Sequence, residues 1–134
     1  MSDIVISSRA AEPVGPYPHA RRVGDLLFLS GVGSRVRGQA AVPGEDFEIQ
    51  CRQVFANVRA ILEDSGSSWE RMVDVTVYLT HMTRDFQTFN RLWQEALPDP
   101  ATRPSRTTLE VSSLPTPIDI ELKVIATVTP EAVA

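Results

Sequence analysis

The sequence predicts a single α+β domain in which strands and helices alternate around one mixed sheet. Its periodic segments follow the order strands, helix, strand, helix, strands. The chain has 134 residues, the size of one compact domain, and its 43% apolar content is enough for one core. No internal repeat or low-complexity run divides it. We therefore expect one domain covering residues 1–134.

The first strand pair is predicted around a short apolar run. Residues 26–30, LLFLS, lie between Gly24-Asp25 and Gly31. Five residues are too few for a helix, and an unbroken apolar run is typical of a strand buried on both faces. Residues 18–23 precede it across the Gly-Asp turn, which predicts a β-hairpin.

Two amphipathic helices are predicted. The first follows Pro43-Gly44, with Asp46 as N-cap, Gly66 as stop signal, and an apolar stripe at Phe47, Cys51, Val54, Phe55, Val58, Ile61 and Leu62. Cys51 belongs to that stripe, so we interpret it as a small core residue and not as a nucleophile. The second helix is expected over about 83–97, ending before Pro98, with Phe86, Phe89, Trp93, Ala96 and Leu97 on one face.

The remaining strands are expected at 73–79, 105–112 and 117–128, where apolar and polar residues alternate. Two helices can cover only one face of a sheet of five or six strands. The other face must meet solvent or another subunit. Because 26–30 has the pattern of a strand buried on both sides, we expect a homo-oligomer.

Alternation also suggests where charged groups gather. Leu109 and Val111 alternate with Arg106, Thr108 and Glu110, and in the last strand Ile118, Ile120, Leu122 and Val124 alternate with Asp119, Glu121 and Lys123. If the apolar rows face the helices, Arg106 and Glu121 share the uncovered face. A cation and a partly buried carboxylate can bind an anionic substrate and move protons, although an ordinary ion pair or a solvated strand face gives the same pattern.

Composition disfavours several classes of protein. The net charge of −4 opposes general nucleic-acid binding, although the cluster of Arg21, Arg22, Arg35 and Arg37 is either a solvated surface or a local anion site. One cysteine and two histidines offer no metal-site spacing, and we interpret His81 as a surface or cap residue. No segment approaches the ~18 to 20 apolar residues of a membrane span, and MSDIVISSRA has no signal-peptide pattern. We expect a cytoplasmic protein with no metal and no membrane contact.

Three motifs resemble one known family. The stretch GPYPHARRVGDLLFLSG at 15–31 is followed by AILEDSGSSWERMVDVTVYLTHM at 60–82 and by PSRTTLEVSSLPTPIDIELKVIA at 104–126. In this order they are similar to the signature of the Rid family, the reactive intermediate deaminases, also called the YjgF family. Nearly the whole chain takes part in the resemblance.

The resemblance implies a chorismate-mutase-like α+β fold, a six-stranded sheet with two helices on one face. It further implies a homotrimer with the sheets facing inward and active sites between subunits. Family members that have an arginine at the position of Arg106 hydrolyse small enamines and imines to 2-oxo acids and ammonia without a cofactor. The roles carried over are the carboxylate-binding arginine for Arg106 and the water-activating glutamate for Glu121, with Tyr17, Gly31 and Thr108 as substrate contacts.

Departures from the usual motif resemble the 2-aminomuconate deaminase branch. Pro18-His19 replaces the usual Ser-Gln, the strand exit is SGVGSR, and Glu121-Leu-Lys123 replaces Glu-x-Glu. A substrate with carboxylates at both ends needs a second cation, which His19, Arg22 or Arg35 could supply, and His19 could also donate a proton. A generic 2-iminopropanoate deaminase, a non-catalytic ligand-binding member, and the ribonuclease activity often attached to family names stay open as alternatives.

Overall fold

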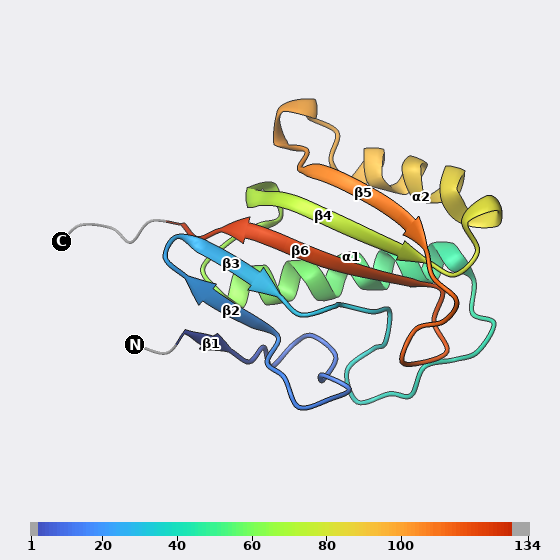
Figure 1. Ribbon diagram of the computed structural model, residues 1–134, viewed down its shortest axis with the longest axis horizontal. Helices are drawn as coiled ribbons and strands as arrows, with labels where there is room; N and C mark the ends of the chain where they lie inside the picture. The colour runs from blue at the N-terminus through green and yellow to red at the C-terminus, as the bar shows by residue number, and fades with distance from the viewer. Residues whose placement is uncertain (1–2, 130–134) are drawn as a thin grey trace.

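The computed structural model describes residues 3–129 as one six-stranded mixed sheet with two helices against one of its faces (Figure 1). The elements in chain order are β1 (Ile4–Val5), β2 (Ala20–Val23), β3 (Leu26–Leu29), α1 (Phe47–Asp64), η1 (Trp69–Arg71), β4 (Met72–Leu79), α2 (Met82–Ala96), η2 (Pro100–Thr102), β5 (Ser105–Glu110) and β6 (Ile120–Thr127). The strand order is β1-β2-β3-β6-β4-β5, with β4 and β5 parallel and the other pairs antiparallel. The predicted fold class is confirmed.

The predicted hairpin and both helices are present. β2 and β3 pair across Gly24, whose φ of 60° is easily reached by glycine. Asp46 caps α1 by accepting from the amides of Glu48 and Ile49, and Gly66 follows the helix with φ 79°. Strand β1 has two residues and pairs with β2; the sequence pattern did not predict it.

The core lies between the sheet and the helices. Aromatic rings from both helices and η1 meet there, with Phe55, Trp69, Phe89 and Trp93 centred 5.3 to 6.1 Å apart. Cys51 is fully buried, and burial raises the pKa of its thiol, so its interpretation as a core residue is confirmed. Within residues 3–129, neither helix is both long enough and apolar enough to cross a bilayer.

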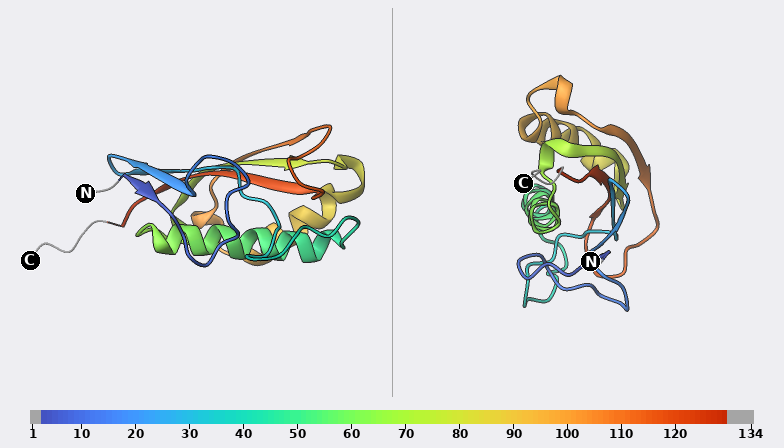
Figure 2. Two further views of the ribbon diagram at one scale, coloured as in Figure 1. Left: turned by 90° about the horizontal axis from the view of Figure 1, so that it is seen from below. Right: turned by 90° about the vertical axis from the view of Figure 1, so that its left-hand side faces the viewer.

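The opposite face of the sheet carries no helix (Figure 2). In β3, Leu27 and Leu29 point to the helices and are fully buried, whereas Leu26 points to the open face and is 40% exposed. Phe28 and Ile125 pair on the open face and are half-buried. Within one chain, therefore, β3 is buried on one face only, and its apolar residues on the open face, Leu26 and Phe28, stay partly exposed.

A β-bulge interrupts the pairing with β6 just after the end of β3. Phe28 pairs with Ile125 and Val32 bridges to Leu122, so the chain advances four residues on the β3 side (28 to 32) against three on β6 (125 to 122). One extra residue on one strand is the geometry of a bulge, a feature common beside active sites because it redirects side chains. Gly31 lies in this bulge.

Candidate active site

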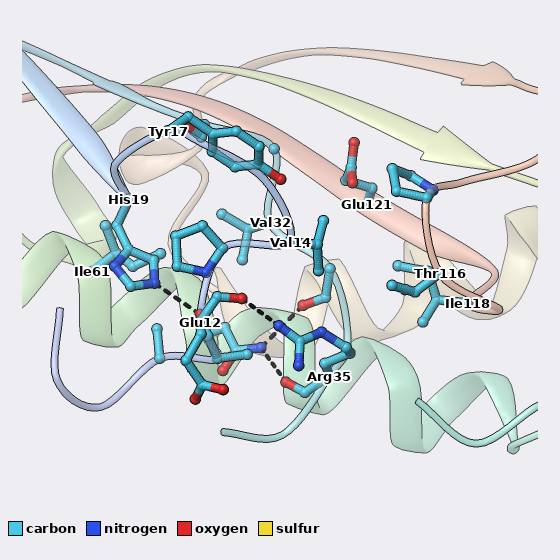
Figure 3. A pocket seen from close by; sticks show the side chains of 18 of the residues that line it. Glu12, Val14, Tyr17, His19, Val32, Arg35, Ile61, Thr116, Ile118 and Glu121 are labelled. Atoms are coloured by element: carbon cyan, nitrogen blue, oxygen red, sulfur yellow. Dashed lines mark hydrogen bonds between the residues drawn. The ribbon is translucent and has the colours of Figure 1, made fainter. Parts of the chain in front are cut away.

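The best-formed pocket of residues 3–129 opens at this bulge (Figure 3). Its walls come from the N-terminal segment 10–19, the bulge at 30–33, the loop at 115–118 and β6. Its empty volume is about 530 Å³, open solvent included. Five of the predicted site residues line it: Tyr17, His19, Gly31, Arg35 and Glu121.

Glu121 is a half-buried carboxylate with no hydrogen bond or ion pair within residues 3–129. Burial raises the pKa of its carboxyl above the ordinary value. The carboxylate lies against Gly31, where a Cβ would come within 2.7 Å of Oε2. Glycine is thus needed for this close approach. A desolvated carboxylate without a partner is well suited to accept a proton from water.

Tyr17 and Gly31 complete the wall beside Glu121. The Tyr17 ring folds back over Gly15, where a Cβ would meet Cε2 at 2.7 Å, and the Tyr17 amide donates to the Gly15 carbonyl over 2.9 Å. Figure 3 shows the phenol and the Glu121 carboxylate on the same side of the pocket. The Gly31 N–H has no partner among the described residues and is free to donate to a ligand.

His19 lines the pocket, and both of its ring nitrogens contact backbone groups. Its side chain is buried; Nδ1 accepts from the Ser7 amide at 2.9 Å, and Nε2 lies 2.7 Å from the Ala11 carbonyl. Because a carbonyl can only accept, Nε2 carries the proton and donates it to Ala11. Both ring nitrogens are therefore occupied by backbone, and His19 fastens the N-terminal segment to β2.

The two candidate arginines near the N-terminus differ in position. Arg35 lines the pocket, and its guanidinium donates to the carbonyls of Glu12 and Gln39, which leaves further N–H groups for an anion. Arg22 lies on β2, donates to the Gly24 carbonyl at 2.9 Å, and does not line the pocket. Of these two arginines, only Arg35 therefore lines the pocket that contains Glu121.

Arg106 lies on the helix side of the sheet, so the prediction that it shares a face with Glu121 is wrong. The register pairs Arg106 with Val75 and Val75 with Val124, both buried against the helices. Glu121 pairs with Tyr78 on the open face. The alternation in 105–112 was assigned to the wrong faces because parallel pairing with β4, and not the apolar residues of this edge strand, fixes the register.

The surroundings of Arg106 leave its charge without a counter-ion. The guanidinium carbon lies 5.0 Å from the ring centre of Phe89, and Nη2 donates to Asn90 Oδ1 at 2.6 Å. Burial lowers the pKa of the guanidinium, and no carboxylate of residues 3–129 pairs with it. Thr108, on the same side of β5, has a buried Oγ1 without a hydrogen bond. An unpaired, half-buried cation of this kind is typical of an anion-binding site.

Asn57 is a pocket residue that the sequence analysis missed. Its side-chain amide donates to the carbonyls of Gly33 and Arg35, at 3.0 and 2.8 Å, and so holds the segment after the bulge against α1. A buried amide on the apolar face of a predicted helix was the available signal, because buried polar groups require partners.

Comparison with known proteins now gives the family. The family model described as Endoribonuclease L-PSP matches residues 7–128. The chain belongs to this family. Within the endoribonuclease L-PSP family it is 35% identical to a RutC family protein of Pyrococcus horikoshii over 94% of this chain and 98% of that protein. It is also 34% identical to the chloroplastic Reactive Intermediate Deaminase A of Arabidopsis thaliana, over 93% of this chain and 65% of that protein.

Solved structures agree with this membership of the endoribonuclease L-PSP family. The crystal structure of E. coli TdcF with bound serine superposes with a TM-score of 0.85 at 29% identity, covering 94% of this chain and 98% of that one. The resemblance to the Rid family found in the sequence is thereby confirmed.

Proposed function

We propose that this protein is a cofactor-independent hydrolytic deaminase that converts small enamine and imine acids to 2-oxo acids and ammonia. The proposal rests on two half-buried charged side chains, Glu121 and Arg106, neither of which has an ion-pair partner among residues 3–129. The similarity to Reactive Intermediate Deaminase A supports the same class of reaction. The acidic net charge of −4 argues against RNA cleavage, the activity that the family's name describes.

In this mechanism the guanidinium of Arg106 holds the substrate carboxylate through its planar fork. Glu121 accepts a proton from a water as the water oxygen bonds to the imine carbon. That proton passes to the nitrogen and leaves a carbinolamine; the hydroxyl proton of the carbinolamine then moves through Glu121 to the nitrogen as the carbon–nitrogen bond breaks and the carbonyl forms. One imine and one water thus give one 2-oxo acid and one ammonia. Tyr17 and the Gly31 N–H are placed to orient the water and the nitrogen.

The proposed site needs two copies of the chain. Glu121 is cross-strand from Tyr78, Tyr78 pairs with Leu109, and Arg106 lies three residues before Leu109. Two strand spacings and three residues separate the groups by about 10 Å in each direction, on opposite faces. A 2-imino acid cannot span that separation. We therefore infer that Arg106 on the edge strand of one copy serves Glu121 of another, within a homotrimer whose open sheet faces point inward.

For the substrate we propose a dicarboxylic enamine such as 2-aminomuconate. Arg35 lines the same pocket as Glu121 and retains free N–H groups for the distal carboxylate. 2-Aminomuconate first gains a proton at the carbon next to its distal carboxylate and loses one from nitrogen, which gives the imine; hydrolysis of that imine yields 2-oxohex-3-enedioate and ammonia. A generic deaminase of 2-iminopropanoate is the alternative.

The test is ammonia release from freshly generated 2-aminomuconate and 2-iminopropanoate. Arg106→Ala and Glu121→Ala should each lower kcat/KM at least ~100-fold, since each removes a charge that acts on the reacting groups. Full activity in both variants would contradict the mechanism. Arg35→Met should raise KM about tenfold for 2-aminomuconate and leave that for 2-iminopropanoate unchanged, with Arg22→Met as the matched control.

A ligand-binding role is the second candidate, because the crystal structure of E. coli TdcF holds serine. Such a protein would bind a small amino acid through Arg106 without turnover. Calorimetry with serine, run beside the ammonia assay, separates the two: binding lost in Arg106→Ala, with no ammonia released by the unmodified protein, favours this role.

A further inference from the structure

Lys123 is the only lysine of the chain, which otherwise carries its positive side chains on arginine. It lies on β6 two residues after Glu121, half-buried on the same open face of the sheet. Nζ donates to the Leu29 carbonyl, and Lys123 forms no ion pair within residues 3–129. The proposed deaminase mechanism gives no role to this half-buried ammonium group.

The bulge explains why the Leu29 carbonyl accepts from a side chain. The Ser30 N–H donates to the His19 carbonyl at 3.0 Å, toward β2. In a trans peptide the preceding carbonyl points the opposite way, so that of Leu29 points toward β6. There the bulge interrupts the ladder, and the Lys123 ammonium takes the place of a backbone donor.

Glu121 contacts the same bulge at Gly31, two residues after Leu29. Its carboxylate lies against Gly31, while the Lys123 ammonium is fixed at Leu29. Successive residues on one face of a strand are separated by about 7 Å. The two side chains therefore lie over one short segment of backbone, too far apart for an ion pair but separated along the strand by less than the Debye length of about 10 Å.

We propose that Lys123 is a positioning residue whose fixed ammonium charge keeps the Glu121 carboxylate ionised at the bulge. The proposal rests on the water-activating role given to Glu121 above. Burial disfavours charge on Glu121, and no other group bonds to it. A positive charge at this distance opposes that effect and makes the carboxylate available as a base at lower pH. Arginine at this position would keep the charge, whereas methionine would keep only the length.

Other charged and titratable groups around Glu121 lie on further elements. They are Tyr78 on β4, Asp119 just before β6, and Glu12, Tyr17, His19 and Arg35 on the pocket walls. Asp119 is already engaged by Thr80, Gln50 and Arg84, and Arg35 by backbone carbonyls. Lys123 is the cation on Glu121's own strand and face.

The experiment measures the ionisation of Glu121 directly, by ¹³C NMR of the side-chain carboxyl carbons in glutamate-labelled protein, with the signal assigned by its loss in Glu121→Gln. In Lys123→Met the titration midpoint should rise by about 0.5 to 1.5 pH units, and Lys123→Arg should restore it. Arg21→Met is the matched control: Arg21 also lies on the open face, but two strands and four residues away, beyond about 15 Å.

The acidic limb of kcat/KM for the imine substrate should move upward in Lys123→Met by the same amount as the NMR midpoint. An unchanged midpoint would overturn the proposal, as would an equal shift in Lys123→Arg, which would indicate packing and not charge. A raised KM without a midpoint shift would also overturn it, since Lys123 would then contact substrate. If the unmodified protein released no ammonia, the proposed function would fail while the NMR titration still decided the role of Lys123.

Discussion

At the scale of single residues, the site is marked by charges that lack partners. Arg9, Arg84 and Arg91 are all paired with carboxylates at 2.7 to 3.3 Å, whereas Arg106 is not. Sequence reasoning found Arg106 and Glu121 as residue types, and the family motif ranked them above their neighbours. The sequence could not show that the two side chains lack ion-pair partners, because the partners of a side chain come from segments far apart in the chain. Arg35, for example, binds the carbonyl of Glu12 in the N-terminal segment.

Gly31→Ala tests the close approach at the bulge. An added Cβ would lie 2.7 Å from Glu121 Oε2, so the carboxylate would have to move from the position in which we propose that it activates water. We expect kcat to fall at least ~10-fold with little change in the melting temperature. The substitution should have no further effect in a Glu121→Gln background, and an equal loss in both backgrounds would contradict the assignment.

Glu121→Gln tests the burial of the carboxylate through stability. Burial raises the folded-state pKa of Glu121 above its unfolded value, so the ionised carboxylate weakens the fold at pH values above the folded-state pKa. That penalty disappears below the unfolded value, about 4.3. Glu121→Gln should therefore melt slightly higher than the unmodified protein at pH 7 to 8, with the difference shrinking toward pH 4. A lower melting temperature at neutral pH would show that the carboxylate stabilises the fold.

At the scale of elements, long periodic segments were predictable and edge strands were not. The stripe from Phe47 to Leu62 and the cap at Asp46 predicted α1 because both signals are local. β1 has only two residues and depends on pairing with β2. β5 had a clear alternation, but as an edge strand only half covered by α2 its apolar residues do not mark the core, and Leu109 is 37% exposed.

Gln50 links α1 to the start of β6 and so places Glu121. It is 2% exposed; Nε2 donates to Asp119 Oδ2 at 3.1 Å and to the Glu45 carbonyl, and Oε1 accepts from the Asp119 amide at 2.8 Å. Gln50→Leu would leave buried polar groups unpaired, and we expect a loss of about 2 kcal/mol in the free energy of unfolding, measured by urea denaturation. Gln87→Leu on the exposed face of α2 is the matched control. Equal small effects of the two substitutions would contradict this role.

At the scale of the whole molecule, one chain holds Arg106 and Glu121 on opposite faces of a sheet that has one uncovered face (Figure 2). The open face bears half-buried apolar side chains, among them Phe28 and Ile125, and the exposed Leu26 and Val23. Arg106 and Glu121 lie on opposite faces, on strands separated by β4. The homotrimer that we propose would account for both features, because a second copy would cover the apolar face and bring its own Arg106 to Glu121. The pattern of 26–30 predicted assembly, and the family resemblance implied active sites between subunits. Strand alternation alone, however, placed Arg106 and Glu121 on one face of the sheet, whereas the strand register places them on opposite faces.

The most direct test is complementation between Arg106→Ala and Glu121→Ala, co-expressed with different affinity tags and purified as mixed oligomers. Each variant alone should retain about 1% or less of the imine hydrolysis rate. If each site takes Arg106 from one copy and Glu121 from another, random mixing should restore about a quarter of the unmodified rate, because about one interface in four combines both intact residues. If both residues acted from the same chain, every site would lack one of them, and mixed oligomers as inactive as the parents would contradict the account.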